Sequence, residues 1–367
     1  KLISGGSTAT TNVAKVGETE YATLEAAVAA VTVTANTITL LTDVIQNTQL
    51  ALNRSLTLNL DGHTIKNEND IWGEKTYCLL RVEDNAVVTI TGNGTVAAKK
   101  DDCYAISITS GSLTIENGTF IGNISAVQVE TGSLTIKDGT FKQIQESKYG
   151  NTYVINCIDD EFASGAAAVA IYGGTFVGFD PNVSPEQKVD GVTPSFAAPG
   201  VGITKNADGT FTAVKDMTAQ LLDADGNSVK AYTSLADAIT AASEGQIVRL
   251  LADAKEDVTI DKNITLDLGG KMLTNTNAGK ATITIAKGAT ATVKNGSVVG
   301  GTSYYNLQNN GTATFEGLTA TAGNNGSSMI DNWGILTIHS GTYTGGMNTV
   351  KSEPTGTLTI NGGDFTC

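Results

Sequence analysis

Gly-Ser-Leu-Thr-Ile-Glu-Asn-Gly-Thr-Phe at residues 111–120 is followed by Gly-Ser-Leu-Thr-Ile-Lys-Asp-Gly-Thr-Phe at residues 132–141, so the chain contains nearly the same ten residues twice. Looser copies of this unit occur at residues 86–96, 167–176, 289–298, 311–320, 334–343 and 356–365. The apolar residue before each turn gives two series, Ile90, Ile115, Ile136 and Ile171, then Val293, Phe315, Ile338 and Ile360. The steps are 25, 21 and 35 residues, then 22, 23 and 22 residues. Such a period predicts a solenoid, in which each repeat stacks on its neighbour.

The residue types indicate which solenoid this is. Leu-Thr-Ile and Val-Thr-Ile are short, alternating and β-branched, which favours strands. A leucine-rich repeat has a similar period, but its asparagine-bearing leucine signature is missing from this sequence. The apolar run after each Asn-Gly or Asp-Gly pair is too short for a hairpin partner, so we interpret the pair as a corner. Strand, corner, strand and loop in each repeat predict an all-β solenoid, the parallel β-helix.

The repeats also predict which side chains stack. Equivalent residues of successive coils lie above one another at about 4.8 Å. Five residues after the anchors stand Phe120, Phe141, Phe176, Tyr343 and Phe365, with Val298 and Ala320 at the same position. Twelve residues before the anchors stand Cys78, Cys103 and Ile124. We therefore expect a buried aromatic ladder and a second ladder that brings Cys78 beside Cys103.

Composition limits the possible partners. The 367 residues carry a net charge of −14 with a pI near 4.5, which disfavours binding to nucleic acid or to an anionic bilayer. No apolar run reaches the roughly 18 residues that a membrane span requires, so we expect no membrane insertion. The 41 glycines and five prolines suit stacked strands with tight corners.

The pattern begins twice along the chain. Thr23 and the apolar residues 24–31 predict a capped helix after a hairpin, and Tyr232-Thr-Ser-Leu-Ala-Asp-Ala-Ile repeats Tyr21-Ala-Thr-Leu-Glu-Ala-Ala-Val. We therefore expect a flexible lead-in at 1–12, β-helix module 1 with a closing hairpin at 13–215, and β-helix module 2 at 216–367. Each module would open with a hairpin and a short capping α-helix over its first coil. Because module 1 runs about 35 residues past the point that matches Cys367, we expect module 2 to be truncated at its C-terminal end.

The order of these motifs carries a resemblance. In chain order, the motifs are Tyr-Ala-Thr-Leu-Glu-Ala-Ala-Val at 21–28, Thr-Ile-Thr-Leu-Leu-Thr-Asp-Val at 37–44, Leu-Asn-Leu-Asp-Gly-His-Thr-Ile at 58–65, the ten-residue repeat at 111–120, and Asn-Ala-Asp-Gly-Thr-Phe-Thr-Ala-Val at 206–214. Together they resemble the right-handed parallel β-helix modules of secreted or surface-displayed bacterial proteins and of phage appendage proteins. The resemblance covers residues 13–367. It implies an extracellular location, on a bacterial cell surface or on the exterior of a virion, and it does not specify an activity.

Enzymes form the alternative class, because right-handed β-helices include pectate lyases and polygalacturonases. Glycosidases need converging carboxylates, and the lyases use carboxylate-held Ca²⁺ with a basic residue. The candidates are Asp159, Asp160 and Glu161, in the 35-residue step where a coil carries an insertion, and secondly the pair Asp101-Asp102. Neither run accompanies a Gly-His-Gly or Arg-x-Lys motif. We therefore interpret Asp159–Glu161 as a solvated loop rather than a catalytic site.

The cysteines suggest a possible bridge. Cys78 and Cys103 would lie within disulfide range in adjacent coils. Stacked side chains point the same way, however, and would strain the bridge, so a reduced core ladder is favoured. Because the sequence has neither a Cys-x-x-Cys motif nor a histidine pair, we expect no metal and no cofactor.

Several aromatic residues lie outside the ladder. Tyr304, Tyr305 and Trp333 are candidates for a sugar-stacking or partner-binding patch, although their spacing does not require a shared face. The others are Trp72, Tyr77, Tyr149 and Tyr153. Ordinary packing of loops is the favoured interpretation of all these residues.

The sequence thus leads us to expect a non-catalytic, extracellular structural or adhesive protein that acts as a spacer and as a display or attachment surface. Its expected interactions are with a surface glycan or a protein partner, or within a homo-oligomer or a virion or envelope assembly. The alternatives are a polysaccharide-acting enzyme, either a lyase or a glycoside hydrolase, and a carbohydrate-binding module.

Overall fold

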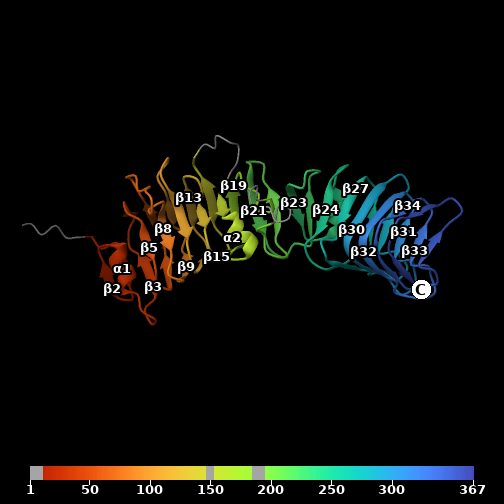
Figure 1. Ribbon diagram of the computed structural model, residues 1–367, viewed down its shortest axis with the longest axis horizontal. Coiled ribbons are helices and arrows are strands. Elements are labelled where there is room, and N and C mark those ends of the chain that lie inside the picture. Colours follow the sequence, from red (N-terminus) through yellow and green to blue (C-terminus); the bar gives the residue numbers. More distant parts are fainter. Residues whose placement is uncertain (1–10, 146–152, 184–194) are drawn as a thin grey trace, which may run out of the picture. The chain divides into compact units, whose positions relative to one another are not determined.

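The computed structural model describes residues 11–145, 153–183 and 195–367, which form an all-β solenoid of parallel strands (Figure 1). The chain divides into two compact units, residues 1–198 with 206–213 and residues 199–205 with 214–367. Residues 199–205, which the sequence places in the closing hairpin of module 1, therefore group with the second unit. Nearly all of the expected lead-in, at 1–12, lies outside the described residues.

The first unit opens with a hairpin and a helix, as the sequence predicts. The hairpin consists of β1 (Ala14–Val16) and β2 (Thr19–Tyr21), and the helix is α1 (Leu24–Ala30). The Thr23 hydroxyl accepts a hydrogen bond from the Ala26 amide at 3.2 Å, which satisfies one of the free amides at the start of the helix. Leu24, Ala27 and Val28 are buried, so α1 packs its apolar face against the first coil.

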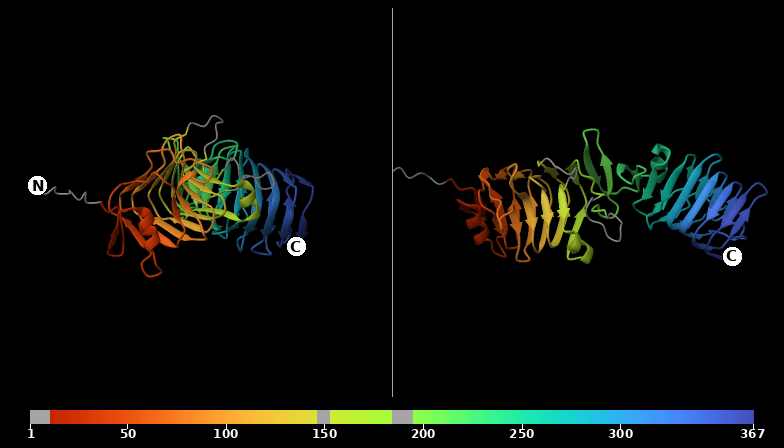
Figure 2. Two further views of the ribbon diagram at one scale, coloured as in Figure 1. Left: turned by 60° about the vertical axis from the view of Figure 1, so that its left-hand side comes forward. Right: turned by 45° about the horizontal axis from the view of Figure 1, so that its top comes forward.

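Three sheets of the first unit then run side by side along the stack (Figure 2). In spatial order, the first sheet contains β18 (Ala167–Ile171), β15 (Gly132–Ile136), β12 (Ser112–Ile115), β9 (Val87–Thr91), β6 (Leu56–Asn59) and β3 (Thr37–Leu40), followed by the opening hairpin. The second contains β21 (Thr210–Val214), β19 (Gly174–Val177), β16 (Thr140–Gln143), β13 (Thr119–Gly122), β10 (Thr95–Ala97), β7 (Thr64–Lys66) and β4 (Val44–Ile45). The third contains β17 (Ile155–Cys157), β14 (Val127–Val129), β11 (Tyr104–Ile108), β8 (Cys78–Val82) and β5 (Leu50–Leu52).

The aromatic ladder of the first unit is confirmed. Phe141 pairs with Phe120 on one side and with Phe176 on the other. The ring centroids are 5.2 and 5.1 Å apart, the rings are within 13° of parallel, and all three side chains are fully buried. Burying each ring is worth roughly 1.5–3 kcal/mol.

The Asn-Gly and Asp-Gly pairs form corners between the first and second sheets. Gly118 and Gly139 occupy equivalent positions with φ of +118° and +124°, a region that favours glycine. A Cβ atom at Gly139 would lie only 2.8 Å from the carbonyl oxygen of Gly118. The glycine therefore lets one coil approach the next, and the chain continues into a new sheet instead of folding back.

The second unit repeats this plan. It contains β20 (Gly202–Lys205), the hairpin β22 (Ala219–Leu222) and β23 (Ser228–Tyr232), and the helix α3 (Leu235–Ala241). The amide of Asp237 donates to the Ser234 hydroxyl at 3.2 Å, which caps α3 as Thr23 caps α1. The predicted opening elements of both modules are therefore present.

The larger sheet of the second unit includes two ten-residue strands that pass through the corner. Its main path is β23, β22, β24 (Ile247–Leu250), β27 (Ile264–Asp267), β30 (Thr290–Val299), β32 (Thr312–Thr321), β34 (Ile335–Ile338) and β37 (Thr357–Ile360), and beside it lie β25 (Ala254–Lys255), β28 (Met272–Thr274), β35 (Gly341–Thr344) and β38 (Asp364–Thr366). The other sheet of this unit has five strands, as the third sheet of the first unit does, and we therefore also call it the third sheet. It contains β26 (Val258–Ile260), β29 (Ile283–Ile285), β31 (Leu307–Asn309), β33 (Ile330–Asn332) and β36 (Val350–Ser352). The predicted columns are confirmed, with Phe315 between Val293 and Ile338, and with Tyr343 stacked on Phe365 at 5.0 Å.

The expected Cys78–Cys103 ladder is wrong by one residue. Cys78 pairs with Tyr104, and neither Cys78 nor Cys103 is in a disulfide. The corner between β8 and β9 has four residues, whereas the corner between β11 and β12 has three, so counting back from the anchors misplaces the register. Asp84 and Asn85 in the longer corner both have a φ of +56°.

Replacing Phe141 with alanine is expected to destabilise the protein by about 3–5 kcal/mol, because it leaves a cavity between two stacked rings. Denaturant unfolding monitored by circular dichroism measures this loss. The control Thr114→Ala changes an outward-facing position of β12 and should stay within about 0.5 kcal/mol of the parent protein. Equal unfolding midpoints for the two variants would contradict the buried stack.

We also expect Cys78 and Cys103 to react with a thiol reagent only after unfolding. Both thiols are buried, and burial raises the pKa of Cys78 to about 12 and raises the pKa of Cys103 as well. Cys367 is exposed and should react quickly in the native protein. In protein that is unfolded without a reducing agent, all four cysteines should react as free thiols. A result of only two reactive thiols would show that two cysteines form a disulfide.

Candidate functional site

The acidic run Asp159–Glu161 lies in a helix, so the expectation of a loop is wrong. These residues form the first turn of α2 (Asp159–Ser164), where Asp159 and Asp160 are exposed. Acidic side chains stabilise the first turn of a helix because they face the positive end of its dipole. That local role accounts for the run.

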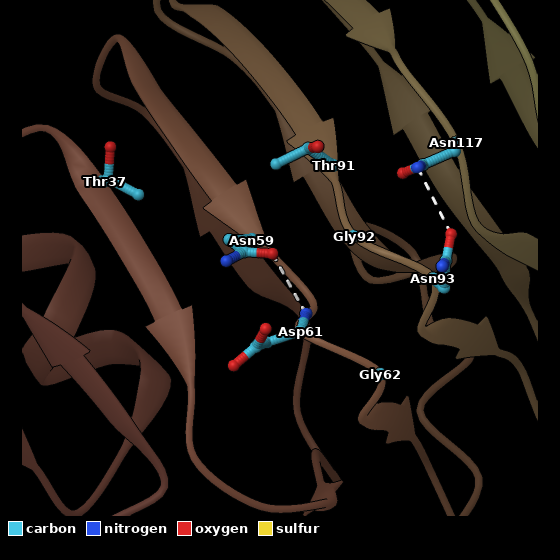
Figure 3. A pocket seen from close by; sticks show the side chains of 8 residues that line it. All are labelled: Thr37, Asn59, Asp61, Gly62, Thr91, Gly92, Asn93 and Asn117. Carbon is cyan, nitrogen blue, oxygen red and sulfur yellow. Dashed lines mark hydrogen bonds between the residues drawn. The ribbon is translucent and has the colours of Figure 1, made fainter.

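One hollow of the first unit lies over its corners. It is a cavity of about 550 Å³ lined by Thr37, Asn59, Asp61, Gly62, Thr91, Gly92, Asn93 and Asn117 (Figure 3). Asn59 accepts a hydrogen bond from the Asp61 amide at 3.0 Å, and Asn117 donates to Asn93 at 3.3 Å. Its polar groups thus bond to one another to form the corners, and the lining contains no aromatic side chain on which a ligand could pack.

The third sheet of the second unit carries a different kind of surface. Its outward positions form one column of polar side chains, each paired with the next, namely Thr259, Thr284, Gln308, Asp331 and Lys351. A cavity of about 240 Å³ lies over the first three of these residues and is also lined by Tyr304, Asp257 and Lys280. We call this column and its cavity the third-sheet groove.

Two tyrosines stand beside the groove. The rings of Tyr304 and Tyr305 have centroids 4.7 Å apart, and Tyr304 lines the cavity. Their loop is fixed from both neighbouring coils, because Asn324 donates to the Tyr304 carbonyl at 3.0 Å and Ser303 donates to the Ala278 carbonyl at 2.8 Å. The tyrosine pair is therefore held in place by backbone contacts, and its rings are available to form one side of a binding surface.

Another part of the cavity lining is supported by Asp257. Its carboxylate accepts hydrogen bonds from the side chains of Asn275 and Thr276, both at 2.6 Å, and from the Asn277 amide at 2.8 Å. These bonds fix the loop that carries Lys280, another residue of the lining. Asp257 thus acts as a structural support of the cavity.

Asp331 is the unusual residue of the groove. It is only 1% exposed, and its Oδ2 atom accepts hydrogen bonds from the indole of Trp333 at 2.9 Å and from Gln308 at 3.3 Å. Its Oδ1 atom is buried and has no hydrogen-bond partner within the described part of the chain. A buried carboxylate oxygen without a partner is costly to the fold. Asp331 is not among the residues that line the cavity, whereas its partner Gln308 is.

The charges around Asp331 define what the groove can bind. Desolvation, and then the negative charge of Asp331, raise the pKa of Tyr305, so its hydroxyl stays protonated at neutral pH and can donate a hydrogen bond. Lys351 is the strand neighbour of Asp331, but its ammonium group forms an ion pair with Glu353, which is the main reason that its pKa is raised. The groove therefore offers hydroxyl donors, a carboxylate acceptor and aromatic faces, a combination that suits a ligand with many hydroxyl groups.

The structure brings two of the three aromatic candidates into contact. Tyr304 and Tyr305 touch each other, and Tyr304 lines the cavity. Trp333 is 45% exposed and donates to Asp331, and it is not among the residues that line the cavity. Sequence reasoning missed Gln308 and Asp331, although a carboxylate in the middle of a short strand was an available signal. Tyr149 lies outside the described residues.

Comparisons with protein-family models, with curated proteins and with solved structures find no match to this chain. The helices among the described residues have at most seven residues, and none of them is long and apolar enough to cross a membrane.

Asp331→Asn is expected to stabilise the folded protein by roughly 1 kcal/mol, because it removes a buried charge that has one unpartnered oxygen. The asparagine oxygen can still accept the indole hydrogen of Trp333. The control Asp364→Asn changes an exposed carboxylate of the same unit and should have no measurable effect. Unfolding midpoints in urea measure both variants, and a lower midpoint for Asp331→Asn would show that the carboxylate supports the fold.

Proposed function

We propose that this chain is a non-catalytic extracellular β-helix protein, a spacer and display surface that attaches through glycan binding. The proposal places it on a bacterial cell surface or on the exterior of a virion, in accordance with the resemblance of its motifs. The observation that carries the binding function is the third-sheet groove, whose cavity is lined by Tyr304, Gln308 and Lys280, with Tyr305 packed on Tyr304 and the exposed Trp333 bonded to the next residue of the column, Asp331.

A pyranose ring is the ligand chemistry that fits these groups. Its C–H face packs on an aromatic ring, and its equatorial hydroxyls both donate and accept hydrogen bonds. Gln308 and Lys280 line the cavity and carry polar groups that can bind such hydroxyls. The net charge of −14 disfavours polyanionic sugars, so a neutral glycan is the proposed ligand.

The role as a spacer follows from how each unit is built. Every coil is joined to the next by parallel pairing in each sheet, and buried aromatic rings stack within each unit. Such nearest-neighbour stacking makes a solenoid a rigid support that can carry binding groups on its outer face.

A polysaccharide-acting enzyme is the competing function. The groove also contains carboxylates, and glycosidases use paired carboxylates near the scissile bond. Incubation with uronate polymers and neutral glucans, followed by assays for unsaturated and reducing ends, separates the two functions. We expect binding without turnover, and sustained release of new ends would establish the enzyme instead.

On a glycan array, the full-length chain is expected to bind neutral glycans, and Trp333→Ala and Tyr304→Ala should each weaken that binding by about tenfold through loss of a ring contact. The control Met272→Ala removes an exposed apolar side chain from the larger sheet of the same unit and should bind as the parent does. Circular dichroism spectra should be unchanged in all three variants. Undiminished binding by both aromatic variants would show that the groove is not the site.

A further inference from the structure

A second aromatic cluster lies in the first unit, beside its own third sheet. Trp72, Tyr77 and Tyr104 contact one another, with centroid distances of 6.2 Å for Trp72–Tyr77, 5.7 Å for Trp72–Tyr104 and 6.3 Å for Tyr77–Tyr104. Trp72 nevertheless remains 52% exposed. The cluster therefore presents an open indole surface instead of closing into a core.

The cluster surrounds a carboxylate, as the groove of the second unit does. The hydroxyls of Tyr77 and Ser107 both donate to Oε1 of Glu130, at 2.7 and 2.8 Å. The guanidinium of Arg81 lies over the Tyr77 ring at 5.9 Å and pairs with Glu83 at 3.1 Å. Within the part of the chain that the structure describes, no hydrogen bond reaches Oε2 of Glu130, which leaves that oxygen for a ligand hydroxyl.

The loop that carries Trp72 is held by a buried support. Asp102 is 5% exposed and accepts hydrogen bonds from the amides of Ile71 and Trp72, at 3.1 and 2.9 Å. Its second oxygen accepts from Asn67 at 2.6 Å. Asp102, which the sequence marks as a weak catalytic candidate, is thus a positioning residue that fixes the indole in advance of binding.

One tyrosine of each cluster, Tyr104 and Tyr305, occupies an equivalent position in the two units. Ile106 and Leu307 each lie in the inward column of the third sheet of their unit. Ile106 pairs with Val127 of the next coil, and Leu307 pairs with Ile330 of the next coil. Tyr104 precedes Ile106 by two residues, and Tyr305 precedes Leu307 by two. The next outward residues are Ser107, which binds Glu130, and Gln308, which binds Asp331.

We infer that Trp72, Tyr77, Tyr104 and Glu130 form a second glycan-binding site, so that one chain carries two. The ligand class, a neutral glycan, rests on the function proposed for the third-sheet groove. Trp72 provides the ring on which a pyranose packs, and Glu130 with the hydroxyls of Tyr77 and Ser107 binds its hydroxyls. Arg81, whose guanidinium lies over the Tyr77 ring, is already paired with Glu83.

The whole chain contains two tryptophans, Trp72 and Trp333, so tryptophan fluorescence can report on the second site once Trp333 is replaced. In the Trp333→Phe variant, Trp72 is the sole indole, and its fluorescence should shift when the full-length protein is titrated with soluble mannan, β-glucan and galactan oligosaccharides. Isothermal titration with the same probes should give two sites per chain for the parent protein, one for Trp72→Ala and one for Trp333→Ala.

The outcomes separate the two sites. Binding that Trp333→Ala abolishes and Trp72→Ala leaves unchanged, with no fluorescence shift of Trp72, overturns the second site and leaves the third-sheet groove. Binding lost only in Trp72→Ala supports the second site and overturns the groove. A parent protein that binds none of the probes overturns both.

Asp102→Asn tests the positioning role separately from folding. It should weaken binding at Trp72 and increase acrylamide quenching of the indole in the Trp333→Phe background, while the binding measured at the groove stays unchanged. Trp72→Phe, which keeps a ring, should retain most of the affinity if Trp72 contacts the sugar. Equal loss in Trp72→Phe and Trp72→Ala, with unchanged unfolding midpoints, would count against ring packing as the contact.

Discussion

In-register pairing of parallel strands is the constraint on which the rest of this structure depends. No separate layer of helices or sheet covers the interior of a coil. Its inward side chains therefore pack against one another within the coil and against the same positions of the neighbouring coils. Once hydrogen bonds place Ile115 between Ile90 and Ile136, the short corner that follows brings Phe141 between Phe120 and Phe176. The ring spacing of 5.1–5.2 Å is close to the spacing of about 4.8 Å between strands. The spacing of the stacked side chains in the core thus matches the spacing of the hydrogen-bonded strands to which they belong.

The inward columns could be predicted from the sequence because they repeat, and the corners limited that prediction because their lengths vary. Counting residues from the anchor works wherever the corner keeps its length, as it does for the phenylalanines. The corner after β8 has one more residue, and the count places Cys103 opposite Cys78 when Tyr104 is the true partner. A left-handed backbone at Asp84 and Asn85 accommodates the extra residue, and both residue types tolerate that conformation. Nothing in the repeat itself reports the insertion.

The same displacement of one residue has a consequence for the surface. Because Tyr104 pairs with Cys78, its ring lies next to that of Tyr77, the residue before Cys78. Sequence reasoning selected Tyr77 and Trp72 as aromatic residues outside the ladder, but it could not join Tyr104 to them without the correct register. Outward positions lack the periodic apolar pattern of the core, so Gln308 and Asp331 also became neighbours only through strand pairing. The aromatic residues of both clusters could be found in the sequence, whereas their polar partners required the structure.

The neighbouring columns of β33 differ in how completely their polar groups are paired. One residue further along the strand, the Asn332 side-chain amide donates to Ser352 and to the Thr357 carbonyl, and its oxygen accepts from Asn309. That buried column satisfies its polar groups and so supports the fold. On Asp331, in contrast, one carboxylate oxygen is left without a partner in the described chain. Single side-chain atoms of Asn117, Ser125 and Asn306 are buried in the same way, and Asp331 is the carboxylate among the four. In a solenoid, stability is approximately a sum over neighbouring coils, so the cost of each such atom stays local and the rest of the stack tolerates it.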